Sequence, residues 1–243
     1  MNVRYERRGP AAWVTFDRPE AHNAMTYDMY ESLFESCERA DGDDEVRALV
    51  LRGAGGKAFV AGTDIRQFLD FASGDDGVEY EARIERVVSR LETVAKPTIA
   101  LVDGFAMGSG IVLAATCDLR ICTPDATFGL PIARTVGNCL SMENYARLVE
   151  VVGEARLKDI VFTARAVEAR EALAIGLATE VVDDAEARVD ELCALIAGHA
   201  AVTLRVTKEA LRRLRPRADG DDLVREAYAS EEFRRRVEAF LKR

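Results

Sequence analysis

The 243-residue sequence predicts a mixed α/β fold that is followed by a helical C-terminal region. Before Ala185, short runs of β-branched and apolar residues alternate with segments of helical periodicity, as is typical of α/β proteins. From Ala185 onward the segments are charged, amphipathic and almost free of strand character. We therefore assign residues 1–184 to a mixed α/β core and residues 185–243 to a helical region.

The N-terminal part is expected to contain two strands with a helix between them. Ala11–Phe16 is the first strand, and it ends at the turn Asp17–Glu20. Thr26–Ala40 has apolar residues at helical spacing, and Val46–Arg52 is the second β-rich run. This order begins the mixed core.

A glycine-rich loop, Gly53–Asp64, follows this second strand and precedes a short helix from about Ile65. Gly62 allows backbone conformations that other residues rarely adopt, and Asp64 stands at a helix-cap position. The N–H of Thr63 is therefore expected to point into a cleft, where it can bind an anion.

The segment after this loop is expected to alternate between polar breaks and helices. Ser73–Gly77 is predicted to be a mobile polar interruption and a candidate lid, and Val78–Ala95 an amphipathic helix. Further on, Thr127–Pro131 leads into the irregular segment Ile132–Leu140, and a helix begins near Ser141. The expected C-terminal helices are Ala185–Ala197, Val202–Leu214 and Asp222–Leu241.

The longest run of small and apolar residues is Thr98–Ile121. It is expected to form the strand Thr98–Val102, a turn, and the buried helix Ile111–Thr116, which follows the glycine-flanked Gly108–Gly110. The first N–H groups of a helix lack internal partners and lie at the positive end of its dipole. Ser109 therefore begins a second turn that can hold an oxyanion or a phosphate.

Other interpretations of this run are less well supported. A transmembrane helix needs about 20 apolar residues, but Asp103 and the β-rich first half oppose it. A dinucleotide fingerprint requires a glycine where Leu113 stands, and a nucleophile elbow requires glycines at Met107 and Ile111. A purely structural helix with small residues for close packing remains an alternative.

Composition excludes several classes of function. A net charge of −9 argues against a nucleic-acid or membrane-surface binder, because such binders need a basic surface. Two basic clusters, Arg212–Arg217 and Arg234–Arg236, fit solvated helix faces, or else contact with a phosphorylated ligand. With only His22 and His199 available, we expect neither a histidine metal site nor a Ser-His-Asp triad. The thiols are an odd number without CxxC spacing and no apolar leader is present, which favours a cytoplasmic protein; they are Cys37, Cys117, Cys122, Cys139 and Cys193.

Several separate motifs resemble the enoyl-CoA hydratase/isomerase, or crotonase, family, and their order and separation agree with it. The two main motifs are Lys57–Ile65 and the run from Lys96-Pro97 through Gly104–Gly110 to Cys117–Arg120. Supporting segments are Asp17–Pro19, Asn23–Met25, Gly176-Leu177, Val181-Val182 and Ala239–Arg243. The resemblance therefore covers nearly the whole chain.

This resemblance implies a spiral of ββα units, an acyl-CoA thioester as ligand, and a C-terminal region that builds homotrimers or dimers of trimers. No cofactor is implied beyond the coenzyme A of the substrate. By position, the backbone amides of Thr63 and Ser109 form the catalytic oxyanion hole. The adenine end of the ligand is expected along Ala61, Asp64, Ile65 and Arg66.

The sequence departs from the family at the two glutamates that hydratases use to activate water. These positions are Val112 and Ile132, and the loss of general acid–base catalysis typically costs about 10²–10⁴-fold per group. We therefore expect an enzyme that stabilises a thioester enolate, with decarboxylation or isomerisation favoured over two-glutamate hydration. The alternative is a CoA-thioester-binding or scaffold subunit without chemistry.

A few polar side chains near these positions are candidates for the missing chemistry. Arg134 can anchor a substrate carboxylate, because its planar fork matches that group. Asn138, Cys139 and Glu143 are candidates for moving a proton or holding water, as is Asp64. Each also has an ordinary structural interpretation, as a turn former, a buried thiol, a first-turn helix residue and a helix cap respectively.

Overall fold

The computed structural model describes residues 2–215 and 220–242 and contains two sheets. The six-stranded sheet has the order β1-β2-β3-β5-β7-β10, and only β1 and β2 pair antiparallel. Its strands are β1 (Val3–Arg8), β2 (Ala11–Phe16), β3 (Ala48–Gly53), β5 (Thr98–Val102), β7 (Leu119–Cys122) and β10 (Glu180–Val181).

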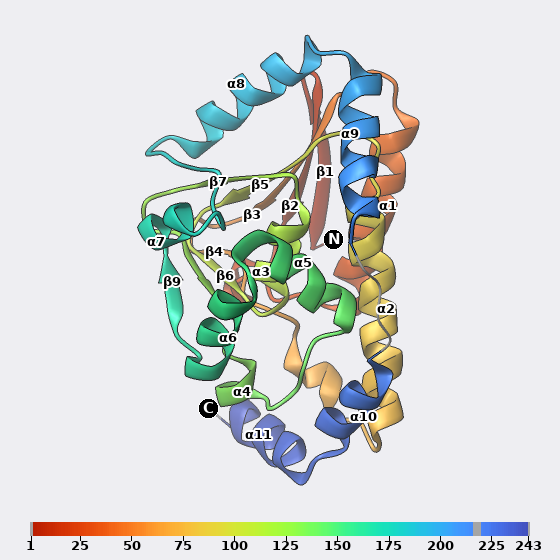
Figure 1. Cartoon of the computed structure of the whole chain (residues 1–243), viewed down its shortest axis with the longest axis vertical. Helices are drawn as coiled ribbons and strands as arrows, with labels where there is room; N and C mark the ends of the chain where they lie inside the picture. The colour runs from red at the N-terminus through yellow and green to blue at the C-terminus, as the bar shows by residue number, and fades with distance from the viewer. Residues whose placement is uncertain (1, 216–219, 243) are drawn as a thin grey trace.

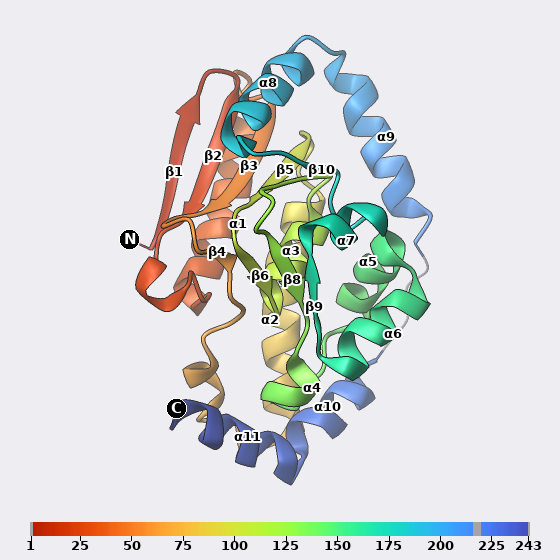
Figure 2. The same ribbon diagram turned by 90° about the vertical axis from the view of Figure 1, so that its left-hand side faces the viewer.

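The four-stranded sheet has the order β4-β6-β8-β9, and its last pair is antiparallel. Its strands are β4 (Ala58–Val60), β6 (Phe105–Met107), β8 (Thr127–Gly129) and β9 (Ala166–Glu168). Each of the pairs β3–β4, β5–β6 and β7–β8 contributes one strand to either sheet, as Figures 1 and 2 show. The chain therefore winds as repeated ββα units, as expected.

The helices surround these sheets. They are α1 (Tyr27–Gly42), α2 (Gly74–Glu92), α3 (Ser109–Thr116), α4 (Ile132–Thr135), α5 (Met142–Val152), α6 (Glu154–Thr163), α7 (Ala169–Ala174), α8 (Ala185–Ala197), α9 (Ala201–Arg213), α10 (Asp221–Ala229) and α11 (Glu231–Leu241). Two 3₁₀ turns are η1 (Pro19–Ala21) and η2 (Ile65–Phe68). Within the described ranges no helix is both long and apolar enough to cross a bilayer.

The large sheet is covered on both faces, which explains why its central strands are mostly apolar. Successive side chains point to opposite faces: in β2, Trp13 packs in a cluster with Val189 of α8, whereas Val14 belongs to the main core. Figure 1 shows α8 above the sheet and α1 beside it. The sheet thus provides a rigid base from which the loops after its strands project.

The prediction that Ser73–Gly77 is a mobile polar interruption is wrong, because helix α2 already begins at Gly74. The carboxylate of Asp76 accepts hydrogen bonds from the backbone N–H groups of Ser73 at 2.7 Å and Ala72 at 2.9 Å, which caps the helix start. Helix α10 lies against this start, since a Cβ added to Gly77 would lie 2.3 Å from the Tyr228 Cγ. The polar residues therefore cap a packed helix.

The expected single helix Asp222–Leu241 is two helices, α10 and α11. Ser230 is extended between them, and its hydroxyl accepts a hydrogen bond from the Phe233 N–H at 3.1 Å, which starts α11. Both helices fold back over the core: α10 lies along α2, and α11 contacts η2 and α4 (Figures 1 and 2). Two residues named from the sequence, Arg217 and Arg243, lie outside the described residues.

Gly77→Ala is expected to lower the free energy of unfolding by about 1–3 kcal/mol, because the new methyl group overpacks the contact with Tyr228. Urea unfolding followed by circular dichroism measures the change. Gly42→Ala in α1 is the matched control, since a Cβ there meets nothing within 4 Å, and it should be neutral or slightly stabilising. Equal stability of the two variants would contradict close packing of α10 on α2.

Candidate active site

A cavity of about 570 Å³ lies where the two glycine-flanked turns meet helices α2, α3, α4 and α11. Its lining is mostly apolar, with a few polar groups, as is usual for ligand sites. The sequence-predicted residues in this lining are Ala61, Thr63, Asp64, Ile65, Arg66, Ser109, Val112, Ile132 and Asn138. Thus one cavity collects most of the residues that the sequence singled out.

The two turns touch each other at their glycines. Gly62 has φ +107° and Gly108 has φ +57°, both in the region that glycine favours, and a Cβ on Gly108 would lie 3.3 Å from the Gly62 Cα. Among the described residues, neither the Thr63 N–H nor the Ser109 N–H donates a hydrogen bond. Two unpartnered backbone donors therefore lie at neighbouring points of one cavity wall.

Thr63 is held in place through its side chain. Its hydroxyl is 2.8 Å from the Tyr30 hydroxyl and 2.7 Å from the Tyr80 hydroxyl. Burial raises the pKa of Tyr30 to about 12, so this phenol stays neutral. These buried contacts fix the Thr63 backbone and leave its amide available to a ligand.

Asp64 lies at the mouth of the cavity between two arginines. Its carboxylate accepts hydrogen bonds from Arg66 Nε and Arg18 Nη1, both at 2.9 Å, and it caps η2. The hydrogen bond from Arg66 and the others lower the pKa of Asp64 to about 2. Asp64 is therefore a permanent carboxylate with a structural role, and Arg18 also faces Glu20 at 3.9 Å.

The wall opposite the mouth is apolar. Val112 of α3 and Ile132 at the start of α4 are both buried and line the cavity, together with Ile84 and Val88 of α2. The two positions at which the family resemblance leads us to expect glutamates therefore place hydrocarbon side chains in the cavity.

Only one of the other candidate side chains reaches the cavity. Asn138 lines it, and its Nδ2 donates to the Tyr228 hydroxyl at 3.0 Å. Arg134 is exposed on α4, away from the cavity lining. Cys139 is not in the lining either, and burial raises the pKa of its thiol to about 12. Glu143, in the first turn of α5, faces a different pocket of about 330 Å³ beside Arg147.

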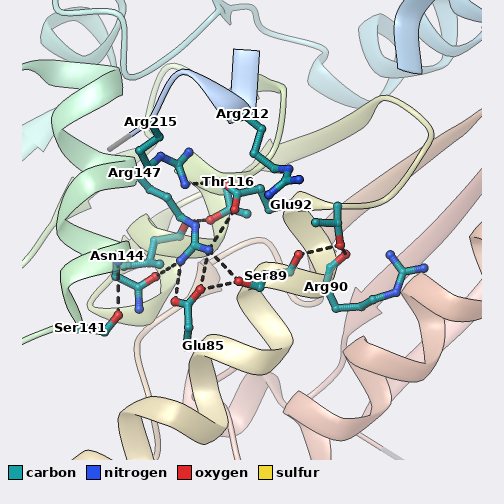
Figure 3. A network of polar contacts seen from close by, with 12 residues as sticks. Glu85, Ser89, Arg90, Glu92, Thr116, Ser141, Asn144, Arg147, Arg212 and Arg215 are labelled. Carbon is teal, nitrogen blue, oxygen red and sulfur yellow. Dashed lines mark hydrogen bonds and ion pairs between the residues drawn. The ribbon is translucent and has the colours of Figure 1, made fainter. Parts of the chain in front are cut away.

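That second pocket contains a network of ion pairs (Figure 3). Arg147 is buried and binds Glu85 through two hydrogen bonds of 2.6 Å, and it also contacts Glu92 at 3.0 Å. Arg215, which follows the end of α9, forms an ion pair with Glu92 at 2.6 Å. The network joins α2, α5 and the C-terminal region through these ion pairs.

Sequence reasoning missed Glu81 of α2. It is 5% exposed and lines the cavity. Its carboxylate accepts hydrogen bonds from the Tyr228 hydroxyl at 2.8 Å and from the Ser141 N–H at 3.0 Å. Burial raises its pKa to about 7. The signal was present, because Glu81 shares the apolar face of its helix with Ile84 and Val88, three and seven residues further on.

Comparison with known proteins identifies the family of the chain. The profile of the enoyl-CoA hydratase/isomerase family matches residues 6–235. The chain is 36% identical to the short-chain-enoyl-CoA hydratase of Clostridium acetobutylicum over 214 residues, which cover 87% of this chain and 81% of that protein.

Solved structures share the fold. An enoyl-CoA hydratase/carnithine racemase from Magnetospirillum magneticum superposes with a TM-score of 0.84 at 28% identity and covers 100% of this chain and 93% of its own. A methylmalonyl-CoA decarboxylase has a TM-score of 0.91 at 24% identity, over 100% of this chain and 96% of its own, which is a likeness of fold. The chain therefore belongs to the enoyl-CoA hydratase/isomerase family.

Proposed function

We propose that this protein is an acyl-CoA enzyme that stabilises a thioester enolate and catalyses decarboxylation or double-bond isomerisation. The observation that carries the proposal is the pair of unpartnered amides, Thr63 N–H and Ser109 N–H, on one wall of a largely apolar cavity. Negative charge accumulates on the thioester oxygen as the enolate forms. Donors already in place at that oxygen therefore favour the transition state over the ground state.

The ligand orientation follows from the charges of the cavity. The exposed guanidinium of Arg66, in the lining of the cavity, suits the phosphates of coenzyme A, with the adenine end along Ala61 and Ile65. The acyl group then extends past the two amides towards the apolar wall of Val112 and Ile132.

The same wall favours reactions with little demand for activated water. Decarboxylation of a malonyl-type thioester requires an enolate acceptor for the electrons of the breaking C–C bond, and apolar surroundings desolvate the leaving carboxylate. Hydration in the usual manner needs two carboxylates around a water, and Val112 and Ile132 supply none. Isomerisation needs one proton carrier at the cavity.

The alternative is a CoA-thioester binder without chemistry, which the aliphatic pair Val112 and Ile132 also supports.

We expect acyl-, enoyl- and malonyl-type CoA thioesters to bind, and at least one to exchange deuterium or form product in D₂O as read by mass spectrometry. A ligand at ~100 times its Kd should add about 2.7 kcal/mol of stability. Binding without exchange or product across the panel would favour the binder, and absence of binding at millimolar concentration would overturn both.

Ser109→Pro should reduce turnover by about 10²–10³-fold, because proline removes one donor to the enolate oxygen. Ser109 is the first residue of α3, a position at which proline is well tolerated. Ser109→Ala is the matched control, since it keeps the backbone N–H, and it should remain near wild type. Steady-state kinetics with the active thioester decide this, and equal losses in both variants would contradict a backbone role.

We also propose a cytoplasmic homotrimer or dimer of trimers. Helix α9 supports assembly, since it buries none of its residues and the apolar side chains Val202, Val206 and Leu211 are exposed on it. Light scattering coupled to size exclusion should give the mass of three or six chains at micromolar concentration. A clean monomer would contradict this proposal and leave the proposed chemistry unaffected.

A further inference from the structure

Glu81 is a buried carboxyl group in the lining of the cavity, and unlike Asp64 it has no arginine partner among the described residues. Oε1 accepts the Tyr228 hydroxyl at 2.8 Å, and Oε2 accepts the Ser141 N–H at 3.0 Å. Each carboxylate oxygen can accept at least one more hydrogen bond. Glu81 is therefore held by two hydrogen bonds, and its oxygens can still accept a proton or a further hydrogen bond.

Within the described part of the chain, no lysine, arginine or histidine forms an ion pair with Glu81. Its neighbour Glu85, one turn along α2, is instead paired with Arg147 (Figure 3). The other titratable groups that face Glu81 are neutral acids; they are Tyr80 on α2, Tyr228 on α10, Tyr145 on α5 and Cys139 in the preceding loop. The two supporting hydrogen bonds oppose the effect of burial, so both protonation states are accessible near neutral pH.

The orientation of the Tyr228 hydroxyl is set by a third residue. Asn138 Nδ2 donates to the Tyr228 oxygen at 3.0 Å, which leaves the hydroxyl proton for Glu81. Asn138 also lines the cavity, and its Oδ1 is buried without a hydrogen-bond partner in the described residues. The chain Asn138, Tyr228, Glu81 thus extends from the loop before α5 through α10 to α2.

We propose that Glu81 carries the proton to and from the α-carbon of the bound thioester. This role rests on the proposed function of the cavity and supplies the acid–base group that Val112 and Ile132 lack. Tyr228 and Asn138 are positioning residues, because they act on Glu81.

The step is a balanced proton transfer. The Glu81 carboxylate takes the α-proton, the electrons of the C–H bond form the C=C bond of the enolate, and the charge moves to the thioester oxygen at the Thr63 and Ser109 amides. The resulting carboxylic acid exchanges its proton with solvent and returns one to the α-carbon. After decarboxylation, the same acid protonates the enolate that the loss of CO₂ leaves.

The first test follows the exchange of the α-protons of butyryl-CoA in D₂O by mass. Wild-type exchange should rise with pH and level off above about 7, because the carboxylate is the reactive form. Glu81→Gln should lose about 10²–10⁴-fold of the exchange rate. The matched control is Glu79→Gln, an exposed residue of the same helix, and it should exchange as wild type does.

The second test separates a proton carrier from a purely structural residue. Tyr228→Phe keeps the ring that packs on Phe233, with centroids 4.9 Å apart, but removes a hydrogen bond that lowers the pKa of Glu81. The rise of the exchange rate should therefore move to higher pH. A rise at an unchanged pH, or wild-type exchange in folded Glu81→Gln, would overturn the proposal.

The outcomes separate this inference from the proposed function. If wild type and Glu81→Gln are both active and only Ser109→Pro is inactive, the enolate site stands and the role of Glu81 is refuted. An inactive wild type that binds no thioester would refute the function itself. If Glu81→Gln does not fold, the wild-type and Tyr228→Phe pH profiles still decide, since a profile that is flat from about pH 5 to about pH 9 contradicts a titrating carrier.

Discussion

The site depends on the contact between two backbone turns that belong to successive ββα units. Gly62 follows β4, and Gly108 follows β6, the next strand of the same small sheet. The parallel pairing of these strands brings both turns to one edge, and both glycines have positive φ angles that other residues rarely adopt. At Gly110, a Cβ would lie 2.1 Å from the Val60 carbonyl oxygen, so the start of α3 also requires glycine. The placement of the Thr63 and Ser109 amides is thus a property of the backbone path.

Closure of the cavity depends on a second close approach, between α2 and α10. The glycines at the start of α2 admit the C-terminal helices, and Tyr228 enters a cluster of aromatic rings with Phe68, Phe71 and Phe233. Phe240 and Leu241 of α11 then line the cavity itself. Because Tyr228 also binds Glu81, the contact that closes the cavity holds its buried carboxyl group as well.

Local chemistry was enough to predict the strands β2, β3 and β5 and the two glycine turns, because each depends on residues adjacent in the chain, whereas the aliphatic replacement of the glutamates followed from the family resemblance. Features that depend on distant partners were not predicted. Ser73–Gly77 is a polar stretch in isolation, and it becomes a helix start when α10 packs on its glycines. The break between α10 and α11 depends on the capping hydroxyl of Ser230. The amphipathic pattern continues through this position, so the sequence predicts one helix. The hydrogen bond that supports Glu81 could not be predicted, because Tyr228 lies 147 positions away.

Three carboxylates of similar intrinsic acidity illustrate how the surroundings divide their tasks. Asp64, between two arginines, has a pKa of about 2 and stays charged; Glu85 is neutralised by Arg147; Glu81, without a cation, has a pKa of about 7. A raised pKa means that the folded state holds this proton more tightly than the unfolded state does. The associated stability is complete below the ordinary value of 4.5 and declines as pH rises through about 7. An ionisable group that costs stability at neutral pH is readily explained where its proton is used. The proton transfer that we propose in the cavity lined by Glu81 would be such a use.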